Sequence, residues 1–242
     1  MLRPATAKSS GSFRGFPREA FSFLSDLSRN NNKAWFDAHR GIYDAAVIGP
    51  ALAFVESLGA ALKTVAASVK AEPRIGGSLF RIHRDTRFSA DRSPYKTHVG
   101  IRLRDGDTAK SSKCAGPLFY VEFDAKSLRL GVGVKDCDNR TLEVYRRAVA
   151  GKKGAKEFGD IIRLAQAKGH DVLGDTLTRV PPPFADQVHN ELLKRKGLFV
   201  REESNLPAEI HQPAFIGYCR RWFEPYAPLF HELRRLAISG LE

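Results

Sequence analysis

The sequence of 242 residues lacks the features that mark membrane proteins and disulfide-rich secreted proteins. Its three cysteines, Cys114, Cys137 and Cys219, form no C-x-x-C pair, and their odd number argues against a disulfide framework. No apolar run approaches the roughly 18 residues that a membrane-spanning helix requires. These absences predict a soluble protein of the reducing cytoplasm, with no membrane partner.

Several motifs of common enzymes are also missing. The sequence contains no G-x-x-x-x-G-K-[ST] loop, no G-x-G-x-x-G after a predicted strand and no G-x-S-x-G elbow. These absences argue against a P-loop nucleotide hydrolase, a Rossmann dinucleotide enzyme and an α/β-hydrolase. We therefore assign no cofactor, and whether the chain is an enzyme stays open.

Positive charge is abundant, because 39 lysines and arginines face 27 acidic residues and give a formal net charge of +12. A positive surface attracts phosphates, nucleic acid or acidic headgroups over a Debye length. The expected partner is an anionic small molecule or a nucleic acid. Composition does not choose between them, and it does not indicate an oligomeric state.

The first third of the chain shows helical periodicity after a polar segment. Residues 1–12 (MLRPATAKSSGS) lack the apolar stretch of a secretory signal and are predicted to be a disordered tail. The remaining residues, 13–242, are predicted to form a single α+β domain. Its first helices are expected at Phe13–Leu27, from about Trp35 after N-cap residues at Arg29–Asn32, and at Leu52–Lys70, where Pro50 restarts the helix.

After Pro73 the apolar period changes from 3.6 to two, which predicts strands. Residues Asp124–Ser127 are short enough for a hairpin, and Asp105–Gly116 resembles an exposed, mobile loop. Short links favour an antiparallel β-meander, packed on one face by N-terminal and C-terminal helices. The four expected strands are Gly77–His83, Thr97–Arg104, Leu118–Phe123 and Leu128–Val134.

Helical periodicity returns beyond Asp138. A glycine at position 169 suits the end of one of these helices, and prolines at 225 and 228 interrupt the last one. Residues Leu198–Val200 are expected as an added edge strand. The expected helices are Leu142–Ala150, Glu157–Lys168, Ala185–Lys196 and the broken segment Ala208–Ile238.

Alternation along the four expected strands separates two faces of the sheet. One face is apolar, from Phe80 and Ile82 to Val132 and Val134, and should be covered by helices. The opposite face combines cations with glycines, which mark places where a ligand or another backbone comes close. This face is interpreted either as a solvated surface or as a concave ligand site. Its residues are Arg81, His83, His98, Gly100, Arg102, Arg104, Tyr120, Glu122, Arg129, Gly131, Gly133 and Lys135.

The densest group of charged side chains is RIHRDTRFSADRSPYKTH, residues 81–98. Its arginines offer bidentate donors to phosphate or carboxylate, and Asp85 could orient them or bind a hydroxyl. The alternative is an ion-pair network in which Asp85, Asp91 and the arginines satisfy one another and hold a turn. The candidate ligand-binding residues are Arg81, His83, Arg84, Asp85, Arg87, Tyr95, Lys96 and His98.

The two histidines among these candidates, His83 and His98, allow further chemistry. With Glu122, His83 and His98 could form a metal-ligand set, but their spacing matches no compact metal motif, and no metal is assigned. Either imidazole could transfer protons near neutral pH, or both could be structural. Tyr95 is expected to be a packing anchor behind Pro94 rather than an acid.

The cluster also resembles the signature of a bacterial family of uncharacterised proteins, a domain of unknown function. The resemblance is carried by Arg81, Arg84, Asp85, Arg87, Phe88, Asp91, Pro94, Tyr95 and Lys96. Blocks such as FRGFPREAFSFL, NNNKAWFDAHRGIY and LLKRKG extend it over residues 13–230. The chain departs from the family at Arg92, where lysine is usual, and at Lys135, which replaces an aromatic residue. The resemblance implies no activity.

Three functional hypotheses follow from these residues. The first is binding of a phosphate-bearing ligand by the Arg/Lys/His cluster on the sheet face. The second is hydrolysis of phosphate esters by His/Asp acid-base chemistry. The third is a structural scaffold in which the motif is an ion-pair network.

Overall fold

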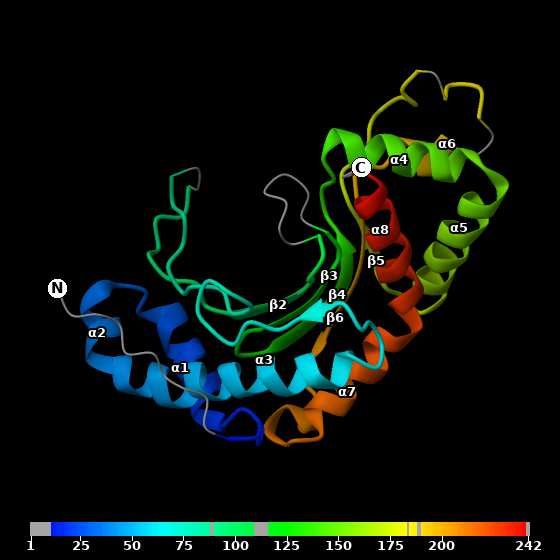
Figure 1. The fold of residues 1–242 in the computed structure, drawn as a ribbon. Coiled ribbons are helices and arrows are strands. Elements are labelled where there is room, and N and C mark those ends of the chain that lie inside the picture. Colours follow the sequence, from blue (N-terminus) through cyan, green and yellow to red (C-terminus); the bar gives the residue numbers. More distant parts are fainter. Residues whose placement is uncertain (1–10, 88–89, 109–115, 183, 188–189, 241–242) are drawn as a thin grey trace.

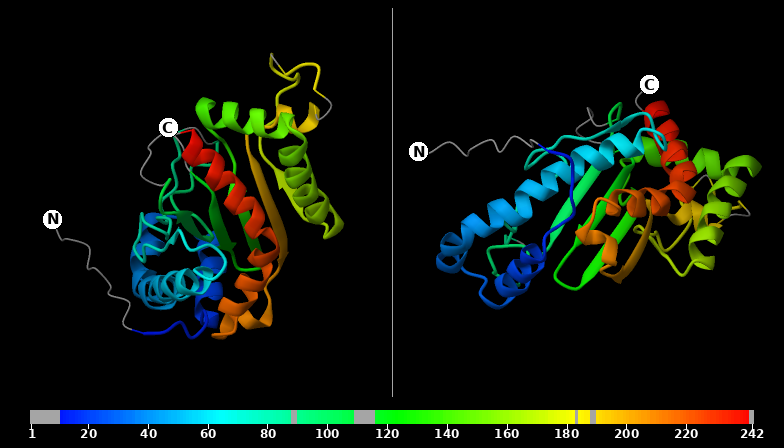
Figure 2. Two further views of the ribbon diagram at one scale, coloured as in Figure 1. Left: turned by 45° about the vertical axis from the view of Figure 1, so that its right-hand side comes forward. Right: turned by 90° about the horizontal axis from the view of Figure 1, so that it is seen from below.

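The computed structural model describes residues 11–87, 90–108, 116–182, 184–187 and 190–240. They form an α+β structure around one six-stranded antiparallel sheet, with the strand order β1-β2-β3-β4-β6-β5. Helices α3, α7 and α8 lie on one side of this sheet (Figures 1 and 2). The strands are β1 (Val69–Lys70), β2 (Val99–Asp105), β3 (Leu118–Phe123), β4 (Ser127–Val134), β5 (Asp171–Leu173) and β6 (Leu198–Asn205).

Three of the four strands expected in the meander form the centre of the sheet. Strands β2, β3 and β4 are consecutive neighbours, and the Asp124 carboxylate closes the β3–β4 hairpin by accepting N–H groups from Lys126 and Ser127. Val121 lies opposite Ile101 on one side and Leu130 on the other. The apolar face of these three strands is confirmed, because its members are all buried: Val99, Ile101, Leu103, Phe119, Val121, Phe123, Leu128, Leu130, Val132 and Val134.

The strand expected at Gly77–His83 is wrong. This segment makes only isolated bridges, from Leu79 to Ile75 and Ile101 and from His83 to Tyr95. A turn around Gly76, whose φ is +80°, forms backbone hydrogen bonds among residues 72–79 and interrupts the alternation of the segment. Leu79 therefore enters the core and Ile82 is buried as expected, whereas Phe80, also expected on the apolar face, lies on the opposite face over Gly100.

The edge strand expected at Leu198–Val200 is longer than predicted and lies inside the sheet. Strand β6 runs from Leu198 to Asn205 between β4 and β5, so the sheet edges are β1 and β5. The sequence does not predict the second half of this strand, because the polar run Arg201–Asn205 lacks apolar alternation. Its backbone pairs fully with β4 nevertheless.

The N-terminal helices are α1 (Arg18–Arg29), α2 (Lys33–Ile42) and α3 (Gly49–Leu62). Asn32 caps α2 as predicted, because its side chain accepts the N–H of Trp35 at 3.0 Å. Pro50 does not restart the helix. A π-helical turn, Tyr43–Ile48, joins α2 to α3, and the Gly49 N–H reaches back five residues to the Asp44 carbonyl. This wider turn accommodates a proline that has no N–H to donate.

The resulting helix, residues 33–62, has the length and composition of a membrane span, with a mean hydropathy of 1.7 in its most apolar window. The sequence predicts no such span, because no uninterrupted apolar run approaches the roughly 18 residues that one requires. Of that window, 56% is buried inside the protein, as in the core helix of a soluble protein. The helix is therefore weak evidence for a membrane span.

The C-terminal helices are α4 (Asn139–Ala150), α5 (Lys152–Ala167), α6 (Asn190–Lys194), α7 (Phe215–Phe223) and α8 (Ala227–Ser239). Short 3-10 turns at Ala208–His211 and Glu224–Tyr226 flank α7. Gly169, with a φ of +72°, follows α5 as predicted. The helix expected at Ala185–Lys196 is shorter, since residues 184–187 form a turn and 188–189 lie outside the described residues.

Two further predictions fall partly outside the described residues, namely the tail at residues 1–10 and the loop at 109–115. In the described beginning of that loop, Asp107 is exposed as expected, whereas Asp105 and Thr108 are buried. Asp105 ends β2 with a fully buried carboxylate, which accepts hydrogen bonds from Thr108 at 2.8 Å and from Arg234 of α8 at 3.0 Å. This contact ties the last helix to the end of a central strand.

Candidate functional site

The sheet face opposite the helices, called the open face below, carries the polar side chains that alternation predicted. Arg102 lies opposite Tyr120, and Glu122 lies opposite Arg129, which in turn lies opposite Glu203 of β6. Strand pleating puts these residues on one side, because their apolar neighbours point into the core. The open face is therefore built by β2, β3, β4 and β6 together.

Aromatic rings cover the glycines of the open face. A Cβ atom at Gly100 would lie 2.9 Å from the Phe80 ring, and one at Gly131 would lie 2.4 Å from the Phe199 ring. Gly133 faces the Leu198 carbonyl of β6 instead. The sequence analysis interpreted these glycines as space for a ligand or another backbone. In the structure, neighbouring rings and the backbone of β6 fill that space.

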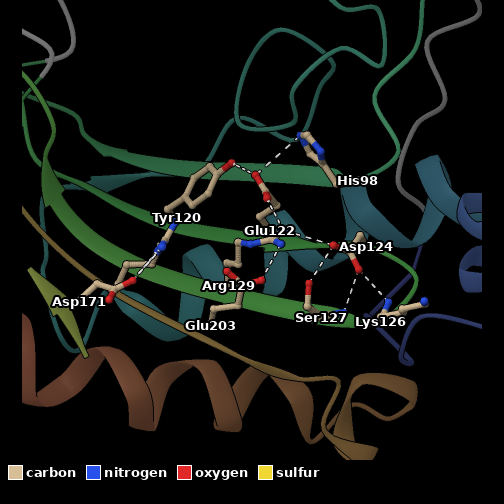
Figure 3. A network of polar contacts seen from close by, with 10 residues as sticks. His98, Tyr120, Glu122, Asp124, Lys126, Ser127, Arg129, Asp171 and Glu203 are labelled. Atoms are coloured by element: carbon tan, nitrogen blue, oxygen red, sulfur yellow. Dashed lines mark hydrogen bonds and ion pairs between the residues drawn. The ribbon is translucent and has the colours of Figure 1, made fainter. Parts of the chain in front are cut away.

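A network of polar contacts centred on Glu122 occupies the middle of the open face (Figure 3). The Glu122 carboxylate, 15% exposed, accepts hydrogen bonds from the Tyr120 hydroxyl and from Arg129 at 2.8 Å. Arg129 also contacts Asp124 at 3.3 Å and Glu203 at 2.7 Å. Three carboxylates thus surround Arg129 and leave the network with excess negative charge. Burial together with Glu122 raises the pKa of Tyr120.

His98 stands at the border of this network. Its Nε2 atom is 3.7 Å from the Glu122 carboxylate, which is too long for a hydrogen bond (Figure 3). Burial lowers the pKa of His98, and the positive charges of Lys96 and Arg129 act in the same direction, whereas Glu122 opposes them. A neutral imidazole at neutral pH follows from this balance.

Arg102 and Arg104 project from β2 on the side of the open face nearer β1. Lys96 lies within electrostatic reach of both Arg102 and Arg81, so the four cations follow one another, and we call them the cation row: Arg81, Lys96, Arg102 and Arg104. Lys96 Nζ donates to the Arg81 carbonyl at 2.8 Å and lies 5.4 Å from the centre of the Phe80 ring. The Arg102 guanidinium lies 4.6 Å from the same ring centre. Phe80 thus brings Lys96 and Arg102 to one aromatic side chain.

The cation row is not neutralised from within the described part of the chain. None of its members forms an ion pair with a carboxylate of the described residues, in contrast to Arg84, Arg87 and Arg129 nearby. Burial and the charge of Arg81 lower the pKa of Lys96. Burial and the charge of Arg104 lower the pKa of Arg102. The positive charges therefore destabilise one another.

A cleft of about 250 Å³ opens at the end of the row where Arg102 and Arg104 project from β2. Lys70, which lies opposite Arg104 in the sheet, adds a third cation, and Glu72 forms an ion pair with Lys70 at 2.7 Å. The remaining wall is the turn of residues 76–78. Cations thus outnumber carboxylates three to one in this cleft. The sequence analysis placed Arg102 and Arg104 on the right face but left them outside the candidate site.

The remaining candidate residues of the motif make contacts within the motif loop. Arg84 forms an ion pair with Asp91, and Arg87 binds both carboxylate oxygens of Asp85, at 2.9 and 2.7 Å. These pairs correspond to the ion-pair network that was the alternative interpretation. His83 is exposed and bridges to the backbone of Tyr95. The motif thus supplies Arg81 and Lys96 to the cation row and uses its other arginines within the loop.

Tyr95 packs rather than facing the open face. Its side chain is 4% exposed and stacks on Phe36 of α2 with ring centres 4.3 Å apart. Asn31 holds its backbone, donating to the Tyr95 carbonyl at 2.9 Å and accepting the Tyr95 N–H at 3.1 Å. The sequence analysis missed this role of Asn31, because the polar run at 29–32 was explained by helix capping alone.

The described residues contain no group of three His, Cys, Asp or Glu side chains that could hold a metal ion. Of the two histidines considered together, His83 contacts Tyr95 whereas His98 borders the Glu122 network. The open face thus brings together a group of cations unpaired within the described residues and, beside it, the imidazole of His98.

Comparison with known proteins gives a family but no activity. The model of a family described as "Conserved hypothetical protein (DUF2461)" matches residues 19–231. The search of curated proteins returned no match. The matched range includes the whole motif, the cation row and the Glu122 network.

Proposed function

Because the chain belongs to this conserved hypothetical protein family, whose description states no activity, we propose its function from the open face: binding of a phosphate-bearing anion by the cation row. A compact phosphate group suits the cleft at Arg102 and Arg104, whose volume of about 250 Å³ is small for a complete organic ligand. The rest of the ligand would extend along the row toward Lys96.

One observation carries this proposal, namely that the four cations lie together without a carboxylate partner among the described residues. Clustered like charges destabilise the folded protein, and a bound anion removes that penalty. Guanidinium groups present paired donors that match the oxygens of a phosphate. The Glu122 network alongside holds three carboxylates against the single cation Arg129, so its excess negative charge repels an anion.

Calorimetric titration of the protein with pyrophosphate, ADP and a short single-stranded oligonucleotide tests this proposal. We expect saturable binding of pyrophosphate that weakens as salt rises, and a loss of about tenfold in Arg104→Gln, the size of a lost charge-assisted hydrogen bond. The matched control is Arg235→Gln, which removes the same charge from an exposed ion pair on α8. Equal losses in the two variants would contradict a local site.

The oligonucleotide distinguishes the two kinds of partner. A small-molecule site predicts that pyrophosphate competes with ADP and that adding nucleotides to the ligand gains little affinity. A nucleic-acid site predicts affinity that grows with oligonucleotide length and a steeper dependence on salt, because more phosphates displace counterions. The short cleft favours the first result.

The position of His98 favours a second candidate function, hydrolysis of phosphate esters. Its neutral imidazole borders the cation row beside Lys96, so it is suited to accept a proton from a water molecule that attacks phosphorus. The ester P–O bond would break, and the alcohol would leave with a proton from solvent. Release of p-nitrophenol from its phosphate monoester and diester tests this function. We expect His98→Asn to abolish turnover and retain pyrophosphate binding; turnover that survives in His98→Asn would contradict it.

A further inference from the structure

A second cleft lies on the other side of the sheet from the cation row. Its volume is about 520 Å³, within the range of small-molecule sites. Glu202 of β6 forms part of the lining and lies opposite Leu130, a buried residue of the helix-covered face. The cleft is therefore separate from the open face, and it is bordered by the end of α5, by β6 and by α7 (Figure 1).

Aromatic rings form the wall of this cleft. Trp222 stacks on His170 with ring centres 5.4 Å apart, and Tyr226 lies 5.2 Å from Trp222. The Tyr226 hydroxyl and Nδ1 of His170 are hydrogen-bonded at 2.6 Å, which fixes the positions of both rings. Tyr218, one helical turn before Trp222, also lines the cleft. Such walls favour a ligand with a cationic or aromatic group.

Four charged side chains line the same cleft without pairing with one another. Glu202 has only His170 within ion-pair distance, at 3.9 Å, and Glu209 has no ion pair among the described residues. Lys168 and Arg221 lie on the exposed rim, also without a carboxylate partner in the described part of the chain. Two carboxylates and two cations thus remain available to a ligand.

The negative charge of the cleft lies beside its aromatic wall. Burial and the Glu202 carboxylate raise the pKa of Tyr226 to about 12. Burial, Glu202 and, among smaller causes, Glu209 raise the pKa of Tyr218. Burial lowers the pKa of His170 despite Glu202, so the imidazole is neutral near pH 7 and leaves the charge of Glu202 uncompensated.

From these walls and charges we infer that the cleft is a binding site for a small zwitterion, an organic ammonium compound that also carries an anionic group. The ammonium group would contact the half-buried rings of Tyr218 and Trp222 near Glu202 and Glu209, while the buried Tyr226 supports them from behind. The anionic group would reach Lys168 and Arg221 on the rim. This arrangement uses every charged residue that lines the cleft.

Three probes of closely related shape test the inference by calorimetry on the full chain. Glycine betaine carries a trimethylammonium group and a carboxylate, 3,3-dimethylbutanoate replaces its nitrogen by carbon, and choline replaces its carboxylate by an alcohol. We expect betaine to bind about tenfold more tightly than either analogue, because each analogue loses one charged contact. An analogue that equals betaine, or the absence of saturable betaine binding, would overturn the proposal.

Single substitutions then test which cleft residues contact the ammonium group and which contact the anionic group of the ligand. We expect Glu202→Gln to reduce betaine affinity about tenfold while leaving 3,3-dimethylbutanoate unaffected, and Arg221→Gln to remove the preference of the site for betaine over choline. The matched control is Glu224→Gln, which removes one carboxylate from an exposed ion pair with Arg220 beside the cleft. Betaine affinity that falls equally in Glu224→Gln and Glu202→Gln would refute a specific ammonium contact. Pyrophosphate binding at the cation row is measured separately and has no bearing on this result.

Discussion

The side chain of Asn31 attaches the motif loop to the N-terminal helices. Its amide makes both a donated and an accepted hydrogen bond with the backbone of Tyr95, as a strand partner would. The site is partly buried, so losing the amide leaves an N–H and a carbonyl without partners. We expect Asn31→Ala to lower the free energy of unfolding by about 1–3 kcal/mol, measured by urea denaturation.

The neighbouring Asn30 provides the control for this prediction. Its amide donates one exposed hydrogen bond to the Asp26 carbonyl, at the end of α1. Surface substitutions of this kind usually change stability by less than about 0.5 kcal/mol. Similar losses in Asn30→Ala and Asn31→Ala would show that helix capping, not the Tyr95 contact, is what the asparagine run contributes.

The titration of His98 reports the charge balance on the open face. Its pKa is lowered in the folded protein, so the unfolded chain binds a proton first as the pH falls through about 6.5, and this residue then favours unfolding. Glu122 is the main group that opposes the shift. We expect Glu122→Gln to lower the pKa of His98 further, as measured by NMR of the imidazole ring. An unchanged or higher pKa would place Glu122 outside the electrostatic reach of His98.

At the scale of elements, β4 and β6 fit together because Gly131 leaves room for the Phe199 ring. A Cβ atom at Gly131 would lie 2.4 Å from that ring, and Phe199 is only 2% exposed. Overpacking of this kind forces side chains or strands to shift. We expect Gly131→Ala to destabilise the protein by about 1–3 kcal/mol in urea denaturation.

A double-mutant cycle separates ring contact from backbone effects at this glycine. In a Phe199→Leu background the smaller side chain should accept the added methyl group, and most of the penalty of Gly131→Ala should disappear. As a control, Gly41→Ala in α2 adds a methyl group with no heavy atom within 4 Å and should stabilise the helix by about 0.5–1 kcal/mol. An undiminished penalty in the Phe199→Leu background would place the cause in the strand backbone.

Elements with clear apolar alternation were predictable from the sequence, and those held by long-range contacts were not. Strand β3 has the predicted limits, Leu118–Phe123, because each second residue is apolar. The segment Gly77–His83 shows the same alternation at Phe80 and Ile82 but follows the turn at Gly76, after which Leu79 and Ile82 are buried and Phe80 is not. Strand β6 carries a polar half that only pairing with β4 makes into a strand.

The candidate site was predictable to a similar degree. Pleating alone placed Arg102 and Arg104 on the correct face. The number of charges in the motif did not reveal which of them are neutralised, because the pairs Arg84–Asp91 and Arg87–Asp85 depend on how the loop folds back. The roles of Asn31 and Phe199 arise from contacts between residues 64 to 68 positions apart, which local patterns do not show.

At the scale of the whole molecule, the net charge of +12 offers a competing explanation for any anion binding. A strongly positive surface attracts polyanions without a defined site. Two multiple variants of equal charge separate the explanations. One replaces the four residues of the cation row by glutamine. The other replaces four exposed cations elsewhere: Lys33, Arg147, Lys153 and Lys156.

We expect the two variants to lose long-range attraction equally, since they carry the same formal charge. Their affinity for a long oligonucleotide at low salt should therefore fall by similar factors. Pyrophosphate is compact and depends on local donors, so its binding should be lost only in the cation-row variant. Calorimetry at two salt concentrations measures both effects. Equal weakening of pyrophosphate binding in the two variants would show that net charge, and not the arrangement on the open face, attracts anions to this protein.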